Sequence, residues 1–288
     1  MHLACNISQF NDNLEESLVY VRDHGIDYVN LNFSPFETTK NETLSQNEIN
    51  FFKSLKNKAD LLDIKFNLIN LDESPKNLSK NELQNEINSV YKISQICKII
   101  ECHKIGIYLN TIFDTNWQGK VSLHLKSILK TLKQTNIKLL LRLSTPSNLR
   151  NLSLLKWNFY NPDIIRNLLA QFPELSLSFS PADCVWLGIN YLELLPALIS
   201  AIDNIEANDI EINRMLLNDS GIFGPIWWQY KLPGLGQLDW RQLLEALKLY
   251  EYKHTITIQI DDDFYLKDHQ SIQDAFIKSS TFLKKHIK

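Results

Sequence analysis

The sequence predicts an α/β protein built as one (β/α)8 barrel, or TIM barrel, and three observations support this fold class. Eight short apolar runs alternate with segments of helical periodicity, which is typical of βαβ units around a parallel sheet. The length of 288 residues suits one barrel of about 250 residues with modest insertions. No repeat, low-complexity tract or linker interrupts the chain, so residues 1–288 are expected to form a single domain.

The expected strands are short, apolar and rich in β-branched residues, as strands covered on both faces should be. In chain order they are Leu3–Ile7, Tyr28–Leu31, Lys65–Ile69, Lys104–Leu109, Ile137–Leu141, Leu175–Phe179, Ala201–Ile205 and His254–Ile258. Eight such strands are the number that closes a barrel of this class.

A helix is expected after each strand, from the spacing of apolar residues. These helices are Leu14–His24, Gln46–Leu62, Lys80–Ile100, Val121–Thr135, Asn161–Gln171, Leu192–Ser200, Trp240–Tyr250 and Ser271–His286. Ser79 with Glu82, and Asn161 before Pro162, are typical helix starts. The stretch from Asp209 to Asp239 is expected to be a long irregular loop, and loops of that length usually serve function.

Composition excludes several classes of protein. The chain has 30 basic and 33 acidic side chains, so its net charge of −3 gives no basic footprint for nucleic acid. No stretch reaches the 18 apolar residues that a membrane span needs, and the amino terminus lacks the pattern of a secretory signal. The four cysteines are scattered without metal-ligand spacing. A cytoplasmic protein with no membrane or nucleic-acid partner is expected.

In a barrel of this class the reacting groups come from the carboxyl ends of the strands. The residues expected there are Asn30, Asn70, Asn110, Arg142, Ser180, Glu206 and Gln259. This set is rich in amides and contains no histidine, no aspartate and no pair of neighbouring carboxylates. A hard divalent cation needs several anionic or imidazole ligands, so we expect no metal and no other cofactor.

Four segments of the carboxyl-terminal half carry a resemblance to a known family. They are FSPADCVWLGIN (179–190), AIDNIEANDIEI (201–212), WWQYKLPGLGQLDW (227–240) and YKHTITIQIDDD (252–263), with a weaker match at LLLRLSTP (139–146). In them the chain resembles the xylose isomerase-like sugar isomerases and epimerases. The proline–glycine segment before Asp239 and Trp240 is the most specific part.

The resemblance also implies which positions would hold the family's metal, and the chain departs at these positions. The glutamate that ends the fifth strand falls on Arg142, the aspartate after the sixth on Ser180, and the histidine beside it on Asp183. The seventh-strand ligand histidine falls on Glu206, with Asn204 and Asn208 at the neighbouring family positions, and the eighth-strand glutamate falls on Gln259. Glu206 remains as one possible ligand.

Arg142 and Glu206 are the candidates for the central chemistry. An interior ion pair between them is one expectation, because a buried charge must be paired. The alternative is that Arg142 binds a carboxylate or phosphate through its planar guanidinium, which suits such groups. In a working enzyme Glu206 would be the general base and Arg142 would bind the developing oxyanion.

The further candidates for substrate binding are Ser180, Asp183, Gln259, Lys231 and Trp228. Lys231 could close over a ligand, or the aromatic residues around it could pack the long loop onto the barrel rim. A relocated metal site built from Glu206 and the aspartates is a further alternative; these aspartates are Asp183, Asp209, Asp261 and Asp262. Asp209 and Asp239 are expected to fix loop conformation.

Three functions follow as hypotheses. The first is a diverged, metal-free relative of the sugar isomerases that has lost their reaction and binds a small polar or anionic molecule. The second is a metal-independent isomerase, epimerase or lyase that uses Glu206 and Arg142. The third is a structural or interaction protein with a filled barrel mouth. A homodimer is compatible with each.

Overall fold

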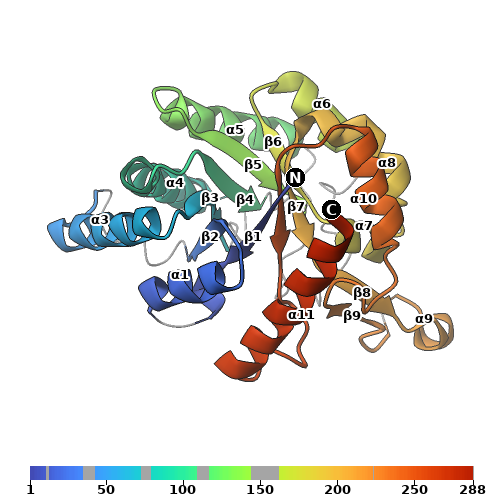
Figure 1. The fold of residues 1–288 in the computed structure, drawn as a ribbon. Helices are drawn as coiled ribbons and strands as arrows, with labels where there is room; N and C mark the ends of the chain where they lie inside the picture. Colours follow the sequence, from blue (N-terminus) through green and yellow to red (C-terminus); the bar gives the residue numbers. More distant parts are fainter. Residues whose placement is uncertain are drawn as a thin grey trace.

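A computed structural model describes residues 1–10, 13–34, 43–72, 79–108, 117–143, 162–222 and 224–287. In this part of the chain, parallel strands form a closed barrel in the order β1-β10-β7-β6-β5-β4-β3-β2, and helices surround it (Figure 1). The predicted fold class, an α/β barrel with eight strands, is therefore confirmed.

The barrel strands lie close to the predicted positions. Their bounds are β1 (His2–Asn6), β2 (Tyr28–Phe33), β3 (Lys65–Leu71), β4 (Lys104–Tyr108), β5 (Lys138–Arg142), β6 (Ser176–Phe179), β7 (Ile202–Ala207) and β10 (Thr255–Ile258). The main differences lie at the carboxyl ends, where β7 extends beyond the predicted Ile205. Glu206 therefore belongs to the strand itself.

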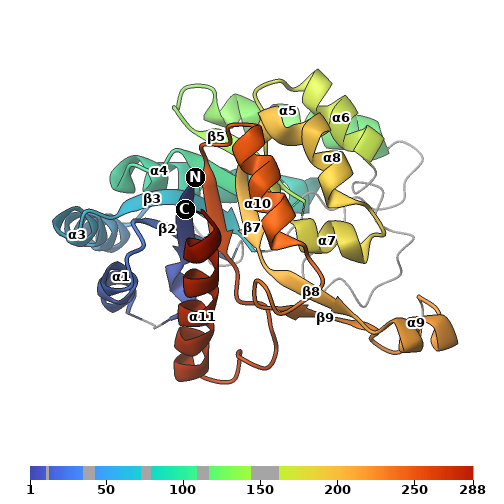
Figure 2. The ribbon, with the colours of Figure 1, turned by 45° about the vertical axis from the view of Figure 1, so that its right-hand side comes forward.

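Helices follow the strands and cover the outside of the barrel (Figures 1 and 2). The α-helices of the barrel layer are α1 (Leu14–Asp23), α3 (Gln46–Leu61), α4 (Lys80–Ile100), α5 (Trp117–Leu132), α6 (Pro162–Gln171), α7 (Pro181–Trp186), α8 (Tyr191–Leu198), α10 (Trp240–Leu249) and α11 (His269–Ile287). Two 3-10 helices are η1 (Ile7–Gln9) and η5 (Ile199–Ala201). Asn161, the expected start of α6, lies outside the described residues.

The sequence predicts some helix starts correctly and misses others. Ser79 caps α4, since its hydroxyl accepts from the backbone N–H of Glu82 at 3.3 Å. Ser45 and Glu48 form a reciprocal capping box at the start of α3. The short helix α7 was not predicted; it begins after Ser180, whose hydroxyl accepts from the N–H of Asp183.

The prediction of an irregular loop from Asp209 to Asp239 is wrong. Residues 209–231 form an arm of two antiparallel strands, β8 (Asp209–Ile212) and β9 (Trp228–Lys231), with the helix α9 (Arg214–Ser220) between them. We call this segment the hairpin arm, and it projects from the barrel in both ribbon views (Figures 1 and 2). No short turn joins the strands, so the usual sequence signal of a hairpin is missing.

The buried carboxylate of Asp209 fixes the base of the hairpin arm. It accepts hydrogen bonds of 2.8–3.0 Å from the backbone N–H groups of Ile210, Gly234 and Leu238 and from Nε1 of Trp240. Asp239 caps α10 by accepting from the N–H of Gln242 at 2.9 Å. The expectation that both aspartates fix conformation is confirmed.

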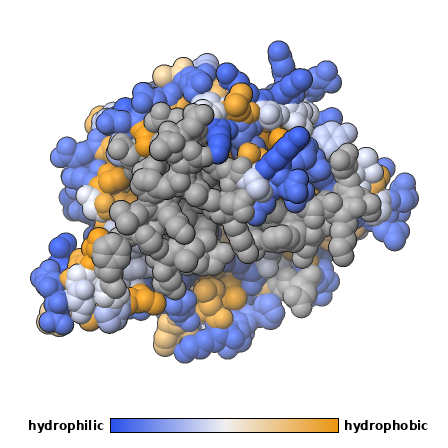
Figure 3. All heavy atoms as spheres, turned by 180° about the vertical axis from the view of Figure 1, so that it is seen from behind, coloured by the Kyte–Doolittle hydropathy of each residue, from blue (hydrophilic) through white to orange (hydrophobic). Residues whose placement is uncertain are grey.

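One face of the molecule can be followed in a space-filling view (Figure 3). Hydrophilic side chains dominate the outer rim of the face shown in Figure 3, and hydrophobic residues lie between them. Among the helices that the structure describes, none combines the length and hydrophobicity needed to cross a membrane.

Candidate functional site

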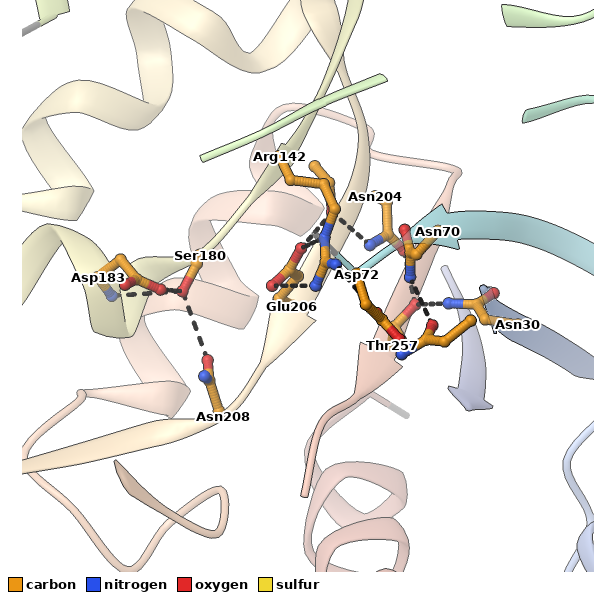
Figure 4. Close-up of polar contacts among 12 residues, drawn as sticks. Asn30, Asn70, Asp72, Arg142, Ser180, Asp183, Asn204, Glu206, Asn208 and Thr257 are labelled. Carbon is orange, nitrogen blue, oxygen red and sulfur yellow. Dashed lines mark hydrogen bonds and ion pairs between the residues drawn. The ribbon is translucent and has the colours of Figure 1, made fainter. Parts of the chain in front are cut away.

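Strand register brings the candidate residues together inside the barrel. Arg142 on β5 pairs with Ser178 on β6, and Ser178 pairs in turn with Asn204 on β7. Side chains alternate along a strand, so Glu206 lies on the same face of β7 as Asn204. Both residues are buried, and Figure 4 shows Glu206 and Arg142 directed toward each other.

Arg142 and Glu206 form the predicted ion pair. Nε of Arg142 donates to Oε1 of Glu206 at 2.9 Å, and Nη2 lies 3.4 Å from Oε2. The two residues are only 5% and 2% exposed, respectively, so little water reaches the pair. Attraction between the charges is therefore stronger than on a surface, but each ion has also lost its hydration.

Other groups contact the guanidinium of Arg142. The ring of Tyr108 lies under it, with its centroid 4.2 Å from Cζ, and Oδ1 of Asp72 lies 3.9 Å from Nη1. Burial alone would lower the pKa of Arg142, but Glu206 and Tyr108 outweigh that effect and raise it above its usual value. Arg142 is thus a permanent cation of the barrel mouth.

Two buried atoms in this region have no hydrogen-bond partner among the residues that the structure describes. They are Nη1 of Arg142, a donor, and Oδ1 of Asn70, an acceptor. The absence of a side chain at Gly106 makes room for both residues, because a Cβ atom there would lie 2.4 Å from Oδ1 of Asn70 and 3.3 Å from Cδ of Arg142. A buried polar atom without a partner is costly, so such atoms are frequent at binding sites.

Ser180 and Asp183 belong to a second polar group, next to the ion pair along the mouth (Figure 4). The Ser180 hydroxyl donates to Oδ2 of Asp183 at 2.5 Å, and the Tyr230 hydroxyl lies 3.1 Å from both oxygens of that carboxylate. Asn208 joins this group, 3.5 Å from the Ser180 hydroxyl, and donates to Asp261 at 3.1 Å.

The remaining candidates lie on the hairpin arm and after β10. Nζ of Lys231 lies 3.4 Å from Oε2 of Glu211, its neighbour on the arm. The ring of Trp228 packs edge-on against Trp186 and Tyr230, so these aromatic residues attach the arm to the rim. Gln259 is buried, and its backbone N–H donates to the carbonyl of Ala207.

The residues that could hold a metal are dispersed. Within the described ranges, no group of three His, Cys, Asp or Glu side chains is arranged for metal binding. Asp209 is saturated by its four donors, and Asp183 is held by Ser180 and Tyr230. The relocated site of aspartates is therefore not formed by these residues. Asn110, the expected residue at the end of the fourth strand, lies outside the described part of the chain.

Several residues at the site were missed from the sequence. Tyr108, Ser178 and Thr257 are each two residues before a position that was considered, Asn110, Ser180 or Gln259. The two-residue period of a strand places them on the same inward face, so that period was the signal available. Asp72 lies two residues after Asn70, which was considered, so the same period applies to it; it follows a strand that is longer than predicted.

Sequence comparison with known proteins gives a partial match. No family model matches the chain. The uncharacterized protein YfiH of Bacillus subtilis (strain 168) is 25% identical over 114 residues, which are 36% of this chain and 36% of that protein. The match therefore spans only about a third of the relative.

Solved structures match over nearly the whole chain. The probable 3-DHS dehydratase AsbF of Bacillus anthracis has a TM-score of 0.75 and 10% identity, covering 99% of both chains. D-Psicose 3-epimerase of Clostridium cellulolyticum H10, solved with D-tagatose, has a TM-score of 0.71 and 11% identity over 100% of both chains. A xylose isomerase domain protein of Planctomyces limnophilus has a TM-score of 0.71 and 13% identity, covering 99% of this chain and 97% of that one.

The chain has the fold of the xylose isomerase-like barrels. The resemblance seen in four sequence segments thus extends to the whole xylose isomerase-like fold, although the identities of 10–13% in these three structures concern the fold alone.

Proposed function

We propose that the chain is a diverged, metal-free relative of the sugar isomerases and epimerases that binds a small polar or anionic molecule at Arg142. It does so without the reaction of those enzymes. The observation that carries this proposal is the buried guanidinium of Arg142. It is paired with Glu206 through two nitrogens, and its Nη1 has no hydrogen-bond partner within the described ranges.

Charge argues against a divalent cation at this place. Two unit charges 4 Å apart repel by about 4 kcal/mol at an effective dielectric constant of 20, and a divalent ion near Arg142 would be repelled by about twice as much. Glu206 and Asp183 are the carboxylates at the positions that the family uses. Arg142 already occupies both oxygens of Glu206, and the hydroxyls of Ser180 and Tyr230 bind Asp183. The residues present do not fit a metal with several carboxylate ligands.

The two buried atoms that lack a hydrogen-bond partner among the described residues indicate which polar groups the ligand carries. Nη1 of Arg142 can donate to an acceptor, and Oδ1 of Asn70 can accept from a donor. Hydroxyl and carbonyl groups on neighbouring atoms of one small molecule would satisfy both. Because Glu206 neutralises Arg142, an anionic ligand must displace Glu206, whereas a neutral polar ligand can bind beside the ion pair.

A filled mouth is the second candidate function, and the same ion pair favours it. If Arg142 and Glu206 serve only to fill the barrel, function lies on an outer face. A metal-independent enzyme is less favoured, because Glu206 must release Arg142 and Ser178 before it can accept a proton.

Metal content and ligand binding test the proposal. Elemental analysis of the purified, dialysed protein should find no stoichiometric Mn, Mg, Co or Zn. About one equivalent of metal per chain that is lost in Glu206→Ala would contradict the proposal.

Thermal unfolding with inorganic phosphate or D-tagatose as probes tests the ligand. A probe that binds the native state raises Tm. We expect phosphate or D-tagatose to raise the Tm of the wild type but not that of Arg142→Met. Arg166→Met, on the exposed face of α6, is the matched control and should respond as the wild type does. Equal shifts in both variants, or none in the wild type, would favour the filled mouth.

A further inference from the structure

A continuous path of side-chain hydrogen bonds runs through the barrel, from Lys104 at the amino-terminal end of β4 to Glu206 at the mouth. All of its bonds are between 2.7 and 3.1 Å long. In order the donors and acceptors are Nζ of Lys104 to Oδ1 of Asn67, Nδ2 of Asn67 to Oδ1 of Asn30, Nδ2 of Asn30 to Oγ1 of Thr257, Oγ1 of Thr257 to Oδ1 of Asn204, Nδ2 of Asn204 to Oγ of Ser178, and Oγ of Ser178 to Oε1 of Glu206. We call this path the axial chain.

The direction of the axial chain is fixed at its Lys104 end. An ammonium group can only donate, so Asn67 must present its carbonyl oxygen to Lys104 and its NH2 group to Asn30. The same reasoning orients Asn30, and the Thr257 hydroxyl, which accepts from Asn30, must donate onward to Asn204. No amide in the axial chain can be reversed without losing a bond.

The Glu206 end requires the same direction. An ionised carboxylate can only accept, so the Ser178 hydroxyl must donate to it and accept from Asn204. The interior members of the axial chain are buried, where a bond that is not made costs most. A barrel of this class is usually filled by bulky branched side chains, so this polar interior is a specific feature of the chain.

We propose that the axial chain fixes the orientation of Glu206 and its pairing with Arg142, and that Thr257 and Asn204 are positioning residues of the site. Hydrogen bonds aligned in one direction polarise one another, so each donor strengthens the next. The Ser178 proton points at Glu206 because Asn204 presents its NH2 group to Ser178. Oδ1 of Asn204 accepts from the Thr257 hydroxyl at 2.7 Å and also lies 3.0 Å from the Thr255 hydroxyl. This inference concerns how the ion pair is held in place. It rests on the proposed function only for the role of the ion pair in binding a ligand.

The charged groups at the two ends are few. Arg142 contacts Glu206 directly, with Tyr108 and Asp72 against its guanidinium. At the other end, Lys104 also donates to the backbone carbonyl of Asp203 at 3.2 Å. The side chain of Asp203 is bound by Lys138 at 2.7 Å and lies 3.4 Å from His254.

A double-mutant cycle tests the proposal without any ligand, so failure of ligand binding and failure of the axial chain are distinguishable. Thr257→Val, which removes the hydroxyl, is introduced into the wild type and into Glu206→Gln, and the shift that it causes in the urea midpoint of unfolding is measured in each background. We expect its shift to fall by roughly half or more when Glu206 is neutral, because coupled sites are not additive. Thr257→Ser, which keeps the hydroxyl, should shift the midpoint equally in both backgrounds. Equal shifts for Thr257→Val would overturn the proposal.

The Lys104 end of the axial chain supplies a second test, which does not depend on the folding of the Thr257 variants. Lys104→Met and Lys138→Met each remove one cation at the same end of the barrel, but only Lys104 begins the axial chain. The midpoint shift of Lys104→Met should depend on whether residue 206 is Glu or Gln, and that of Lys138→Met should not. The same dependence for both lysines would mean that general charge effects, and not the axial chain, act on Glu206.

Discussion

Arg142 shows how one side chain can change the chemistry available at the end of a strand. Its guanidinium is buried, carries a charge at any physiological pH and contacts Glu206, Tyr108 and Asp72. Such a charge is tolerated only while its partner is present. The behaviour of the mouth therefore depends on the pair and not on either residue alone.

The ion pair gives the first prediction. Arg142→Met or Glu206→Gln alone should lower the free energy of unfolding by about 3–5 kcal/mol, because each leaves one buried charge without its partner. The double variant should cost less than the sum of the two, since contacting residues are coupled. Denaturant unfolding of the three variants supplies the cycle. Additive costs would mean that the two charges do not stabilise each other.

Gly106 gives a second prediction. In Gly106→Ala, the new Cβ would meet Oδ1 of Asn70 at 2.4 Å, so Asn70 and Arg142 must move. We expect a loss of about 1–3 kcal/mol in the free energy of unfolding, as for other overpacked cores. Gly188→Ala is a control for a site with open space, although its positive φ of 74° adds backbone strain. An unchanged stability for Gly106→Ala would mean that Asn70 and Arg142 leave room for a methyl group at residue 106.

At this scale the sequence predicted the pair but not its surroundings. Arg142 and Glu206 stood out as the one cation and the one carboxylate among the expected strand-end residues, and a buried charge requires a partner. The axial chain gave no comparable signal, because asparagine, serine and threonine are ordinary residues in isolation. Only the register, with its shifts at Asn30 and Ser178, places them within hydrogen-bonding distance.

Two helices are joined by a charged contact that depends on pH. Oε1 of Glu48, in the first turn of α3, lies 2.8 Å from Nζ of Lys92 on α4. The Glu48 carboxylate also closes the capping box with Ser45. Lys92 first, and then Ser45, lower the pKa of Glu48 from 4.5 to about 2. This carboxylate therefore ties the start of α3 to α4 only while it is ionised.

The third prediction concerns this contact. Because the folded-state pKa is lowered, the stabilisation is fully present above pH 4.5 and is lost as the pH falls toward 2. Glu48→Gln should be less stable than the wild type at neutral pH, and the difference should shrink in that window. The side chain is 38% exposed, so we expect no more than about 1 kcal/mol. Glu82→Gln, at the matching position of α4, is the control, and a constant difference down to pH 2 would refute the assignment.

The hairpin arm gives the fourth prediction. Asp209→Ala leaves four donors at the base of the arm without their acceptor, at a cost of about 1–3 kcal/mol for each one that stays buried. Asp209→Asn keeps one acceptor oxygen and should cost less. Urea unfolding measures both variants, and near-ultraviolet circular dichroism reports Trp240. Similar stability of Asp209→Ala and the wild type would show that water satisfies these donors.

The hairpin arm also shows where prediction of elements failed. Asp209 to Ile212 does alternate between polar and apolar residues, as a strand with one covered face should. Its partner strand begins only at Trp228, after a helix. A pairing over such a separation has no local sequence signal. The barrel elements were predicted better because each repeat has its own periodicity.

The barrel is a closed sheet, and its closure links distant parts of the chain. β1 pairs with β10, so residues near the two termini share a ladder of hydrogen bonds, and the termini lie close together in both ribbon views. The number and order of strands could be predicted from alternation alone. The polar filling of the barrel could not, because it depends on which faces of all the strands meet at the axis.

The fifth prediction concerns cooperativity. Since β1 and β10 close the barrel and Asp209 anchors the hairpin arm, we expect residues 1–288 to unfold as one unit. Far-ultraviolet circular dichroism reports the helices. Tryptophan fluorescence is weighted toward the hairpin arm and its base, because four of the six tryptophans, Trp186, Trp227, Trp228 and Trp240, lie there. Coincident urea transitions for these two probes would support a single domain. Separate transitions would mean that the arm and the barrel are independent units.

Under the proposed function, the ion pair also limits the routes by which evolution could return this chain to metal chemistry. Changing Arg142 to glutamate in one step would place a second carboxylate against Glu206 and near Asp72, with no cation yet bound. Changing Glu206 first would leave the guanidinium buried alone. Either intermediate is less stable than its ancestor and its descendant, so natural selection would meet a barrier in both directions. Once such a pair has been acquired, loss of the metal is difficult to reverse by single substitutions.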